Sequence, residues 1–509
     1  MNLFRNFLSA NETLIKMLLK HLVTLLLCAV GAAVQAADYA GPLGSNPDPH
    51  VTYYGGFYYY TGTARPEEGS IVMLHRAKTL QEIKYSPTQT VWSEQQSVAV
   101  GGPCCYYWAP ELHRIDNKWY IYFSAVQRAG QEEIKWHRNY VIENTNSDPF
   151  VGTWTYKGQL KDSQNDFWAI DATILQLRGT NYILYSGHAD NDHSLQRIYI
   201  SKLENPWTQV PGRTMITEPQ YSFETNGNVN EGPEILMKNG KVFMVYSANG
   251  CWTNQYNLGM LWMNEGDDPM NAASWRKLNY PVFGANPAVG AYSPGHNSFF
   301  KSPDGTQDWI AYHAAATANE GCEINRFFNA KLVNWKSDGF PDFGAPVANG
   351  HLLPGPSGEP GLSTGAVLAN GVYEVVNVVS GRSLDVPSCR GESGLKLQQW
   401  DVYHNDCQKF VFHNVGEDYY SISAVGGGML LTIKDCKNDP ATDVWLYKPT
   451  GQDCQKWRIV SHGNNEYSFI SKSANMAFDL RSGNQANGAD YIVWTTTFEW
   501  PQKFRLTRV

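Results

Sequence analysis

The sequence has few charged residues and lacks any block of positive charge. Only 17% of its 509 residues are Asp, Glu, Lys or Arg, and the formal net charge is −8. Nucleic-acid binding depends largely on clustered Lys and Arg side chains that neutralise phosphates, so we expect no nucleic-acid partner. Long runs rich in Ala, Glu, Lys and Leu are also scarce, which argues against a mainly helical fold.

Long hydrophobic runs are confined to the N-terminus. Two lysines precede the apolar run 22–30, and small residues follow it up to Ala36. This order is typical of an export signal, and it predicts a signal peptide over residues 1–36. Either Met1 or Met17 is the start, because the chain from Met17 onward is a complete signal by itself. We therefore expect a secreted protein, extracellular or periplasmic, whose mature form does not associate with membranes.

Aromatic residues and glycines are abundant. Phe, Trp and Tyr make up 13% of the chain, including 17 Trp and 29 Tyr. This composition favours β structure with many short strands. Most of the rings should lie in cores, although aromatic faces also stack on the C–H faces of sugars. Eight of the nine cysteines follow the predicted signal, and in an oxidising compartment they can pair.

The last third of the chain contains a repeat of about 47 residues. A Gln-Lys-aromatic triplet occurs at 408–410, 455–457 and 502–504, and a second set of apolar triplets upstream keeps the same spacing. Three copies of a unit made of short strands predict a closed threefold β structure.

Cysteines in this region recur 18 residues apart within a repeat. The two pairs are Cys389 with Cys407 and Cys436 with Cys454. In the third repeat both positions change together, to Gly483 and Pro501. Joint loss is what a disulfide within each repeat predicts, so we expect these two bridges.

The triplets resemble the QxW motif of ricin-type lectins, which implies a β-trefoil over residues 369–509. In that family an Asp accepts hydrogen bonds from sugar hydroxyls, and an aromatic about 15 residues later stacks beneath the sugar. The matching pairs are Asp385 with Trp400 and Asp479 with Trp494. The middle lobe has Thr432 in place of Asp, which implies lost binding. Cys407, Cys454 and Pro501 stand where the family often has Asn, so a purely structural trefoil is the alternative.

The N-terminal region, residues 37–353, has a longer repeat. Five segments begin with a polar head residue and continue with an apolar stretch, a turn and an aromatic-rich strand, and the heads recur every 60–65 residues. Such units predict the blades of a propeller, with the heads together at one end of a central channel. The Pro- and Gly-rich residues 354–368 predict a linker. The expected fold is therefore all-β, a five-bladed β-propeller followed by a β-trefoil.

Ionisable side chains occupy the heads of all five repeats. They are Asp48, Glu111, Asp171, Glu231 or Glu234, and His296. A buried cluster of like charges is costly unless it is paired or tuned, so such clusters mark functional sites. Glycoside hydrolysis needs two carboxyl groups, one to protonate the departing oxygen and one to activate water or attack. Capping of β-turns is the alternative reading of each head.

The heads resemble those of glycoside hydrolase family 43. The matching segments are 46–51, 107–111, 169–172, 231–233 and 295–298. The resemblance implies a five-bladed propeller that inverts the anomeric centre, with Asp48 as general base and Glu231 as general acid. Asp171 would raise the pKa of the acid and orient it, because a nearby negative charge disfavours a second one.

The same resemblance implies further site residues. His296 would lie near a calcium ion whose shell water completes, and no other cofactor is expected. Arg326 would contact the sugar, and Trp108 would form a wall beside it. Segments 251–261 and 295–305 are most similar to the family's α-L-arabinofuranosidases, which implies an exo-acting enzyme on plant arabinan or arabinoxylan. A β-xylosidase and a non-catalytic sugar-binding protein are the alternatives.

Two further questions concern neighbouring residues. The remaining cysteines are consistent with a vicinal Cys104–Cys105 bridge and a Cys251–Cys322 bridge. Glu231 and Glu234 flank Pro233, and aligning the repeats on their prolines places Glu234 opposite Glu111. This alignment leaves Glu231 without a counterpart, so we expect Glu231 to have the chemical task and Glu234 a structural one.

Overall fold

The computed structural model describes residues 39–65, 68–80, 83, 86, 88–127, 136–164, 166–190, 194–322, 326–349, 352–359, 368–416, 419–425 and 427–509. The predicted signal peptide lies outside these residues. Among the described residues, no helix has both the length and the apolarity needed to cross a membrane.

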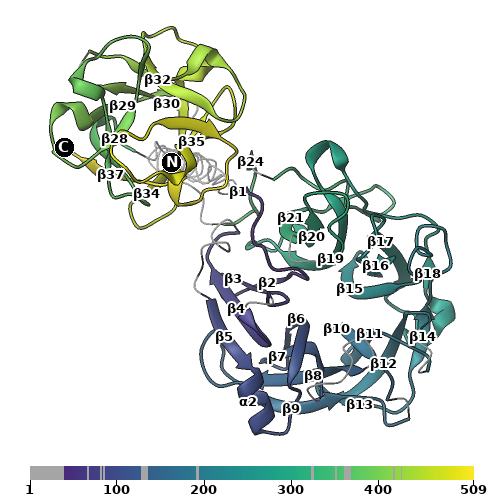
Figure 1. Ribbon diagram of the computed structural model, residues 1–509. Coiled ribbons are helices and arrows are strands. Elements are labelled where there is room, and N and C mark those ends of the chain that lie inside the picture. Colours follow the sequence, from purple (N-terminus) through teal and green to yellow (C-terminus); the bar gives the residue numbers. More distant parts are fainter. Residues whose placement is uncertain are drawn as a thin grey trace, which may run out of the picture.

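Five antiparallel sheets surround a central axis in the N-terminal part, as Figure 1 shows. Blade 1 contains β2 (His50–Tyr54), β3 (Phe57–Thr61), β4 (Ile71–Ala77) and β5 (Thr88–Ser93). Blade 2 contains β6 (Cys105–Ile115), β7 (Lys118–Val126), β8 (His137–Asn144) and β9 (Thr155–Leu160), and α2 (Glu94–Ala99) precedes it. The first strand of each blade lies innermost. The predicted five-bladed propeller is confirmed.

The other three blades follow the same order. Blade 3 contains β10 (Ala169–Leu177), β11 (Thr180–Gly187) and β12 (Arg197–Asn205), with β13 (Thr208–Gln209) and β14 (Thr214–Thr217) on β12. Blade 4 contains β15 (Asn230–Lys238), β16 (Lys241–Ala248), β17 (Asn257–Asn264) and β18 (Arg276–Lys277). Blade 5 contains β19 (Tyr292–Lys301), β20 (Asp308–Ala315) and β21 (Arg326–Leu332). The short strands β22 (Asn334–Trp335) and β23 (Pro341–Asp342) form a separate pair.

Residues ahead of blade 1 complete blade 5. The backbone N–H of Leu43 donates to the carbonyl of Phe328 at 2.8 Å, and the N–H of Phe328 donates to the carbonyl of Gly44 at 2.9 Å. These bonds extend the outer edge of β21, which would otherwise stay unpaired. Strand β1 (Tyr39–Ala40) also pairs with β24 (Leu352–Leu353), so the two ends of the propeller region are joined.

Local sequence explains why the blades are built from hairpins. Asp116 and Asn117 join β6 to β7, and Asn239 and Gly240 join β15 to β16; all four have positive φ. Two such residues in succession form the tight turn whose twist suits an antiparallel pair. Central strands such as β7 are buried along almost their whole length, because both of their faces pack against neighbouring blades.

Part of the predicted linker lies on the propeller. The Glu359 side chain is buried, and its carboxylate accepts a hydrogen bond from the backbone N–H of Leu80 at 2.8 Å. The backbone N–H of Ser357 donates to the side-chain oxygen of Gln307 at 2.9 Å. Residues 354–359 are therefore held against blades 1 and 5, and 361–367 lie outside the described residues.

The C-terminal lobe is a single sheet of thirteen strands with threefold pseudosymmetry. Its first repeat contains β25 (Gly371–Asn377), β26 (Ser383–Asp385), β27 (Leu395–Lys396) and β28 (Gln398–Trp400). Its second contains β29 (Lys409–Gly416), β30 (Tyr419–Ala424), β31 (Leu430–Ile433) and β32 (Thr442–Tyr447). Its third contains β33 (Trp457–Ser461), β34 (Glu466–Ser471), β35 (Ala477–Leu480), β36 (Tyr491–Trp494) and β37 (Phe504–Arg508). The aromatic residues of the three triplets, Phe410, Trp457 and Phe504, are fully buried in one core.

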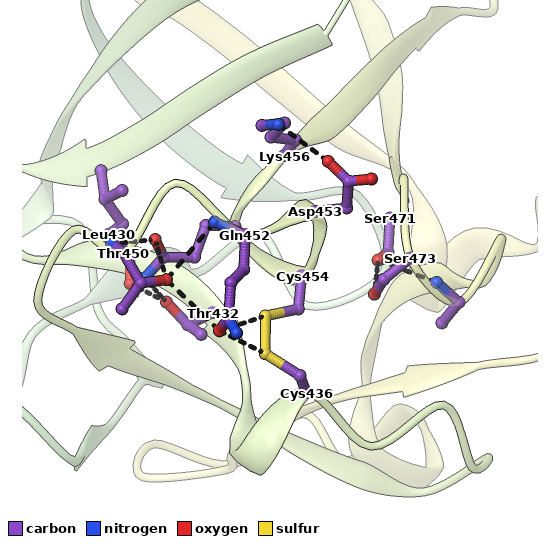
Figure 2. Close-up of a disulfide and its surroundings, with 12 residues drawn as sticks. Leu430, Thr432, Cys436, Thr450, Gln452, Asp453, Cys454, Lys456, Ser471 and Ser473 are labelled. Atoms are coloured by element: carbon purple, nitrogen blue, oxygen red, sulfur yellow. Dashed lines mark hydrogen bonds and ion pairs between the residues drawn. A yellow bond between two sulfur atoms is a disulfide. The ribbon is translucent and has the colours of Figure 1, made fainter.

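Four disulfides join the eight cysteines of the described chain. The pairs are Cys104–Cys105, Cys251–Cys322, Cys389–Cys407 and Cys436–Cys454. Figure 2 shows Cys436–Cys454 beside Thr432 in the middle lobe. In the third lobe Gly483 and Pro501 occupy the two cysteine positions and remain close, since a Cβ added to Gly483 would lie 3.5 Å from Cγ of Pro501.

Candidate active site

One residue in each blade has a left-handed backbone at the same point near the axis. These residues are Asp48, Ala109, Asp171, Gly232 and His296, with φ between 42° and 58°. Register shifts occur around this position in β6, β10, β15 and β19. Their shared conformation makes the five positions structurally equivalent.

This equivalence corrects the expected set of heads. Glu111 is not the counterpart of Asp48, because it lies two residues beyond the equivalent Ala109. Glu234 occupies the same deeper position as Glu111, which agrees with the alignment on prolines. Glu231 lies one residue before its blade's left-handed position. The backbone bulge, which the sequence does not reveal, causes these offsets.

Each left-handed residue is fixed by the preceding blade. The five backbone N–H groups donate to Thr63 Oγ1 (from Ala109, 2.7 Å), Ser124 Oγ (from Asp171, 3.1 Å), Asp171 Oδ2 (from Gly232, 3.0 Å), Ser247 Oγ (from His296, 2.7 Å) and His313 Nδ1 (from Asp48, 3.1 Å). Left-handed conformations of non-glycine residues are costly and persist where the surroundings hold them. These bonds between blades therefore set where the site's side chains lie.

The Asp48 carboxylate lies beside a hydroxyl donor, a guanidinium group and two histidine rings. Its Oδ2 accepts a hydrogen bond from the Thr63 hydroxyl at 2.6 Å, and its Oδ1 lies 3.2 Å from Nη1 of Arg326. The Nδ1 atoms of His313 and His296 lie 3.3 Å and 3.5 Å from the same oxygen. Burial alone would raise the pKa of Asp48, but Arg326 and the two rings hold it well below its usual value. Asp48 is therefore ionised.

Glu231 has neutral partners instead. The Tyr256 hydroxyl donates to Oε1 at 2.8 Å, and the Gln196 amide donates to Oε2 at 2.8 Å. Burial raises the pKa of Glu231, and the two hydrogen bonds lower it only in part. The negative charge of Asp48 adds to the rise. Glu231 consequently keeps its proton to a higher pH than an exposed glutamate.

Asp171 lies between these two groups in the ring. Its Oδ2 accepts the N–H of Gly232, the residue that follows Glu231. Burial raises the pKa of Asp171 well above its usual value, and the charges of Glu231 and Asp48 raise it further. The ring of bonds between blades thus fixes a carboxyl group next to Glu231.

A deeper layer of polar side chains lies beneath these groups. Its members are two residues beyond the left-handed positions: His50, Glu111, Thr173, Glu234 and Ser298. The Nε2 of His113 lies 2.7 Å from Oε2 of Glu111, and the Nε2 of His50 lies 3.8 Å from Oε1 of Glu234. Burial raises the pKa of both glutamates well above the usual value. Glu111 is thus paired within its own strand, whereas the contact between His50 and Glu234 joins blades 1 and 4.

The calcium ion that the resemblance implied near His296, with water completing its shell, stays a prediction, because the described residues around the axis offer few oxygen ligands of their own. The donor atoms of His50, Glu111 and His113 lie within 4.8 Å of one another, but two of the three are nitrogens. Calcium takes six to eight oxygen ligands. The charged neighbours of His296 are the Asp48 carboxylate and the Arg326 guanidinium. The positive guanidinium would repel a cation.

Exposed or half-buried aromatic side chains occur near the site residues in the sequence. Trp108 is half-buried in β6, and its ring stacks on His137 with centroids 3.7 Å apart. Tyr106 and Trp252 are largely exposed, and each lies next to a disulfide in the sequence. The structure also assigns contacts to residues that the sequence analysis missed: Thr63, Gln196, Tyr256 and His313. They come from strand ends and loops whose approach to Asp48 and Glu231 has no local sequence signal.

The trefoil repeats one glutamine clamp in all three lobes. Gln408, Gln455 and Gln502 donate to the side chains of Asp385, Thr432 and Asp479 and to a main-chain carbonyl seven residues earlier. Asp385 also accepts a hydrogen bond from Gln398 at 2.8 Å, whereas Ile492 is the equivalent residue of the third lobe. Trp494 is largely exposed and Trp400 is half-buried. Each predicted pair thus joins a buried Asp, already bonded to the clamp glutamine, to a half-buried or largely exposed Trp.

Comparison with known proteins shows which families the two parts of the chain match. A family model described as glycosyl hydrolases family 43 matches residues 40–341. The chain belongs to glycosyl hydrolase family 43. A second model, described as ricin-type beta-trefoil lectin domain-like, matches residues 365–447 and 406–494. Both resemblances inferred from the sequence are therefore confirmed.

Several relatives of this family 43 chain are characterised. It is 38% identical over 329 residues to an extracellular exo-alpha-(1->5)-L-arabinofuranosidase of Streptomyces avermitilis, covering 63% of this chain and 66% of that protein. It is 36% identical to alpha-L-arabinofuranosidase 43 of Humicola insolens, covering 60% and 62%. The chain thus spans slightly less than two thirds of the length of these two relatives.

A solved structure shares the propeller. It is an alpha-L-arabinofuranosidase from Lactobacillus brevis, 33% identical, with a TM-score of 0.57. The similarity covers 61% of this chain and 98% of that one. The trefoil therefore lies outside the region that the Lactobacillus structure matches.

Proposed function

We propose that this protein is a secreted, exo-acting α-L-arabinofuranosidase that inverts configuration and acts on plant arabinan or arabinoxylan. The single observation that carries the proposal is that the pKa values of two buried carboxyl groups at the axis shift in opposite directions. A neighbouring cation holds the pKa of Asp48 well below its usual value, whereas burial raises the pKa of Glu231 against the two hydrogen bonds that lower it. An ionised base and a protonated acid in one site are what glycoside hydrolysis requires. The names of the relatives support the choice of an arabinofuranose.

In this proposal Asp48 removes a proton from water as the water attacks the anomeric carbon. Glu231 gives its proton to the departing oxygen on the opposite face of the sugar. Asp171, held in place by the N–H of Gly232, would favour the protonated form of Glu231, because two neighbouring carboxyl groups cannot both ionise without repulsion. Water attack opposite the leaving group yields the inverted anomer. The chain therefore needs no cofactor for either proton transfer.

Other side chains would position the reactants. Arg326 and His296 lie against Asp48 and face the position of the water and the sugar. Trp108 would form the wall beside the sugar. Thr63 holds Asp48 through one hydrogen bond and receives the N–H of Ala109 through another, so it ties the base to the strand that carries Trp108.

The remaining regions fit a secreted polysaccharide-degrading enzyme. We propose a signal peptide over 1–36, the hydrolase over 37–353, a linker over 354–368 and the sugar-binding trefoil over 369–509. Asp385 with Trp400 and Asp479 with Trp494 would hold the polysaccharide near the hydrolase, which raises its effective concentration.

The proposal is tested with matched glutamate variants and two nitrophenyl substrates. The wild type should hydrolyse the α-L-arabinofuranoside much faster than the β-D-xyloside, and Asp48→Asn should abolish turnover while the protein remains folded. Glu231→Gln should lose most activity on a substrate with a poor leaving group and less on an aryl glycoside, whose departure needs little protonation. Glu234→Gln is the control, and it should lower thermal stability with a smaller, leaving-group-independent effect on rate.

Three results would contradict the proposal. Preference for the xyloside would indicate a β-xylosidase, and no turnover of either compound would indicate a sugar-binding protein. Leaving-group dependence in Glu234→Gln alone would make Glu234 the acid. Stereochemistry adds an independent check: Asp48 and Glu231 should hold their carboxyl groups about 6.5–9.5 Å apart, and proton NMR of the first product should show the inverted anomer.

A further inference from the structure

A cavity of about 370 Å³ opens on the outer edge of the propeller, away from the catalytic strands. It lies between blade 4, where β17 and residues 278–282 line it, and the segment 336–343, which includes β23. The carboxyl groups of the active site are on or next to the inner strands β2, β10 and β15, whereas β17 and β18 are the third and fourth strands of their blade. The cavity therefore belongs to a separate surface.

Aromatic and apolar side chains form the cavity's base and one wall. Met260 and Phe343 are buried, and the half-buried rings of Trp262 and Phe340 meet edge to face at 5.2 Å. Tyr280, which is 52% exposed, also lines the cavity. An exposed ring at the rim of a hollow keeps one face free for a ligand.

Charged groups in the segment 336–343 also line the cavity and retain hydrogen-bonding capacity. Asp338 Oδ1 accepts the backbone N–H of Phe340 at 3.0 Å, and Asp342 Oδ1 accepts that of Gly344 at 3.0 Å. These bonds fix both carboxylates, while each Oδ2 accepts no hydrogen bond from the described residues. The exposed Lys336 adds donors beside them.

We propose that this cavity binds one sugar unit of a neutral polysaccharide chain, as a binding site separate from the active site and from the trefoil. The proposal rests on the proposed function for the identity of the polysaccharide. A sugar offers an apolar C–H face to Tyr280 and hydroxyl groups that donate to Asp338 and Asp342 and accept from Lys336. The volume lies at the lower end of the range for small-molecule sites, which suits a single ring.

The position of the cavity suggests how such a site would act on a polymeric substrate. A polymer held at the outer edge of blade 4 stays close to the enzyme between cleavage events, and a second contact at the trefoil multiplies the effect through effective concentration. Such a site should influence polymeric substrates and leave small soluble ones unaffected.

Binding is measured by affinity electrophoresis of the full chain in gels that contain soluble arabinan or arabinoxylan. All variants carry Asp48→Asn so that the polymer is not degraded. Tyr280→Ala combined with Lys336→Ala should raise the apparent dissociation constant at least threefold for one of the polymers. Tyr54→Ala, an exposed tyrosine of blade 1, is the matched control and should leave binding unchanged.

Two further measurements separate this proposal from the proposed function. With Asp48 intact, Tyr280→Ala/Lys336→Ala should turn over the nitrophenyl arabinoside at the wild-type rate, and its melting temperature should match that of Tyr54→Ala. Polymer retardation that depends on Tyr280 in a chain without arabinofuranosidase activity would support the site and refute the function. Unchanged retardation in both gels, or an equal loss in Tyr54→Ala, would overturn the site.

Discussion

The pKa of Glu231 depends on one hydroxyl group that can be removed without changing shape. Tyr256 is buried, and its hydroxyl donates to Oε1 of Glu231 at 2.8 Å. This hydrogen bond favours the ionised carboxylate and so lowers the pKa against the larger effect of burial. Tyr256→Phe removes the donor and keeps the ring. The pKa of Glu231 should therefore rise.

The size of the rise follows from the strength of such bonds. A hydrogen bond to a charged acceptor contributes about 1.5–3 kcal/mol, compared with about 0.5–1.5 kcal/mol for a neutral pair. The difference favours the ionised form by about 1–1.5 kcal/mol, and about 1.4 kcal/mol corresponds to one pKa unit. We expect the pKa of Glu231 in the free enzyme to increase by about one unit in Tyr256→Phe.

The pH dependence of kcat/KM measures this shift, because its limbs report the essential acid and base of the free enzyme. Glu231 must be protonated to act, so activity falls as pH rises through its pKa. A higher pKa moves the alkaline limb to higher pH by about one unit and leaves the acid limb in place. The substrate should be an aryl arabinofuranoside with a poor leaving group, because departure of that group needs protonation.

Tyr246→Phe is the matched control. The Tyr246 hydroxyl is also buried and donates to a glutamate, Glu224, at 2.6 Å, and among the described residues neither side chain forms a hydrogen bond to Asp48 or Glu231. Its loss should lower the free energy of unfolding by about 1–3 kcal/mol and leave both limbs unchanged. If the alkaline limb stays in place or moves to lower pH in Tyr256→Phe, the assignment of Glu231 as the acid is wrong.

Three further predictions concern the base and the trefoil. Thr63→Val removes a donor to the ionised Asp48, so the acid limb of kcat/KM should move up by about one pH unit; Thr63→Ser keeps the hydroxyl and should not shift it, and equal shifts would refute this role. Asp385→Ala with Asp479→Ala should reduce retention on insoluble polysaccharide more than either change alone, with turnover of small substrates unchanged; wild-type retention would contradict sugar binding by these lobes. Burial raises the pKa of Asp479 to about 6, so retention of Asp385→Ala, which depends on Asp479, should increase as pH rises through 6, and flat retention between pH 5 and 7 would refute the idea.

The fold could be predicted from the sequence because several copies of one repeat indicate the same structural unit. Five polar heads with aromatic strands predicted the blades, and three glutamine triplets predicted the trefoil lobes. Repetition does not show how the ring closes, however. Residues 43–44 extend β21 through two backbone bonds that depend only on the arrangement in space, so nothing in their side chains indicates the pairing.

The site was accessible in part. The sequence singled out Asp48, Asp171 and Glu231, and the structure gathers their contacts around one axis. The sequence aligned Glu111 with these residues by residue type, whereas the backbone conformation aligns Ala109 with them. A positive φ is unfavourable for alanine, and only the hydrogen bond from Ala109 to Thr63 explains its place there. Such a bond between blades leaves no mark in either local sequence.

The five blades provide equivalent backbone positions at the axis, but the residues at and around these positions differ in charge. Asp48 and Glu231 are both buried, and burial alone would raise both pKa values. The two differ in their partners: Asp48 lies 3.2 Å from a guanidinium nitrogen, whereas Glu231 receives its hydrogen bonds from a phenol and an amide, which carry no charge. A positive charge close to a buried carboxylate outweighs desolvation, and neutral donors do not. The repeated frame therefore places the two carboxyl groups near the axis, and their non-repeated partners, Arg326 beside Asp48 and Tyr256 and Gln196 beside Glu231, accompany pKa shifts in opposite directions.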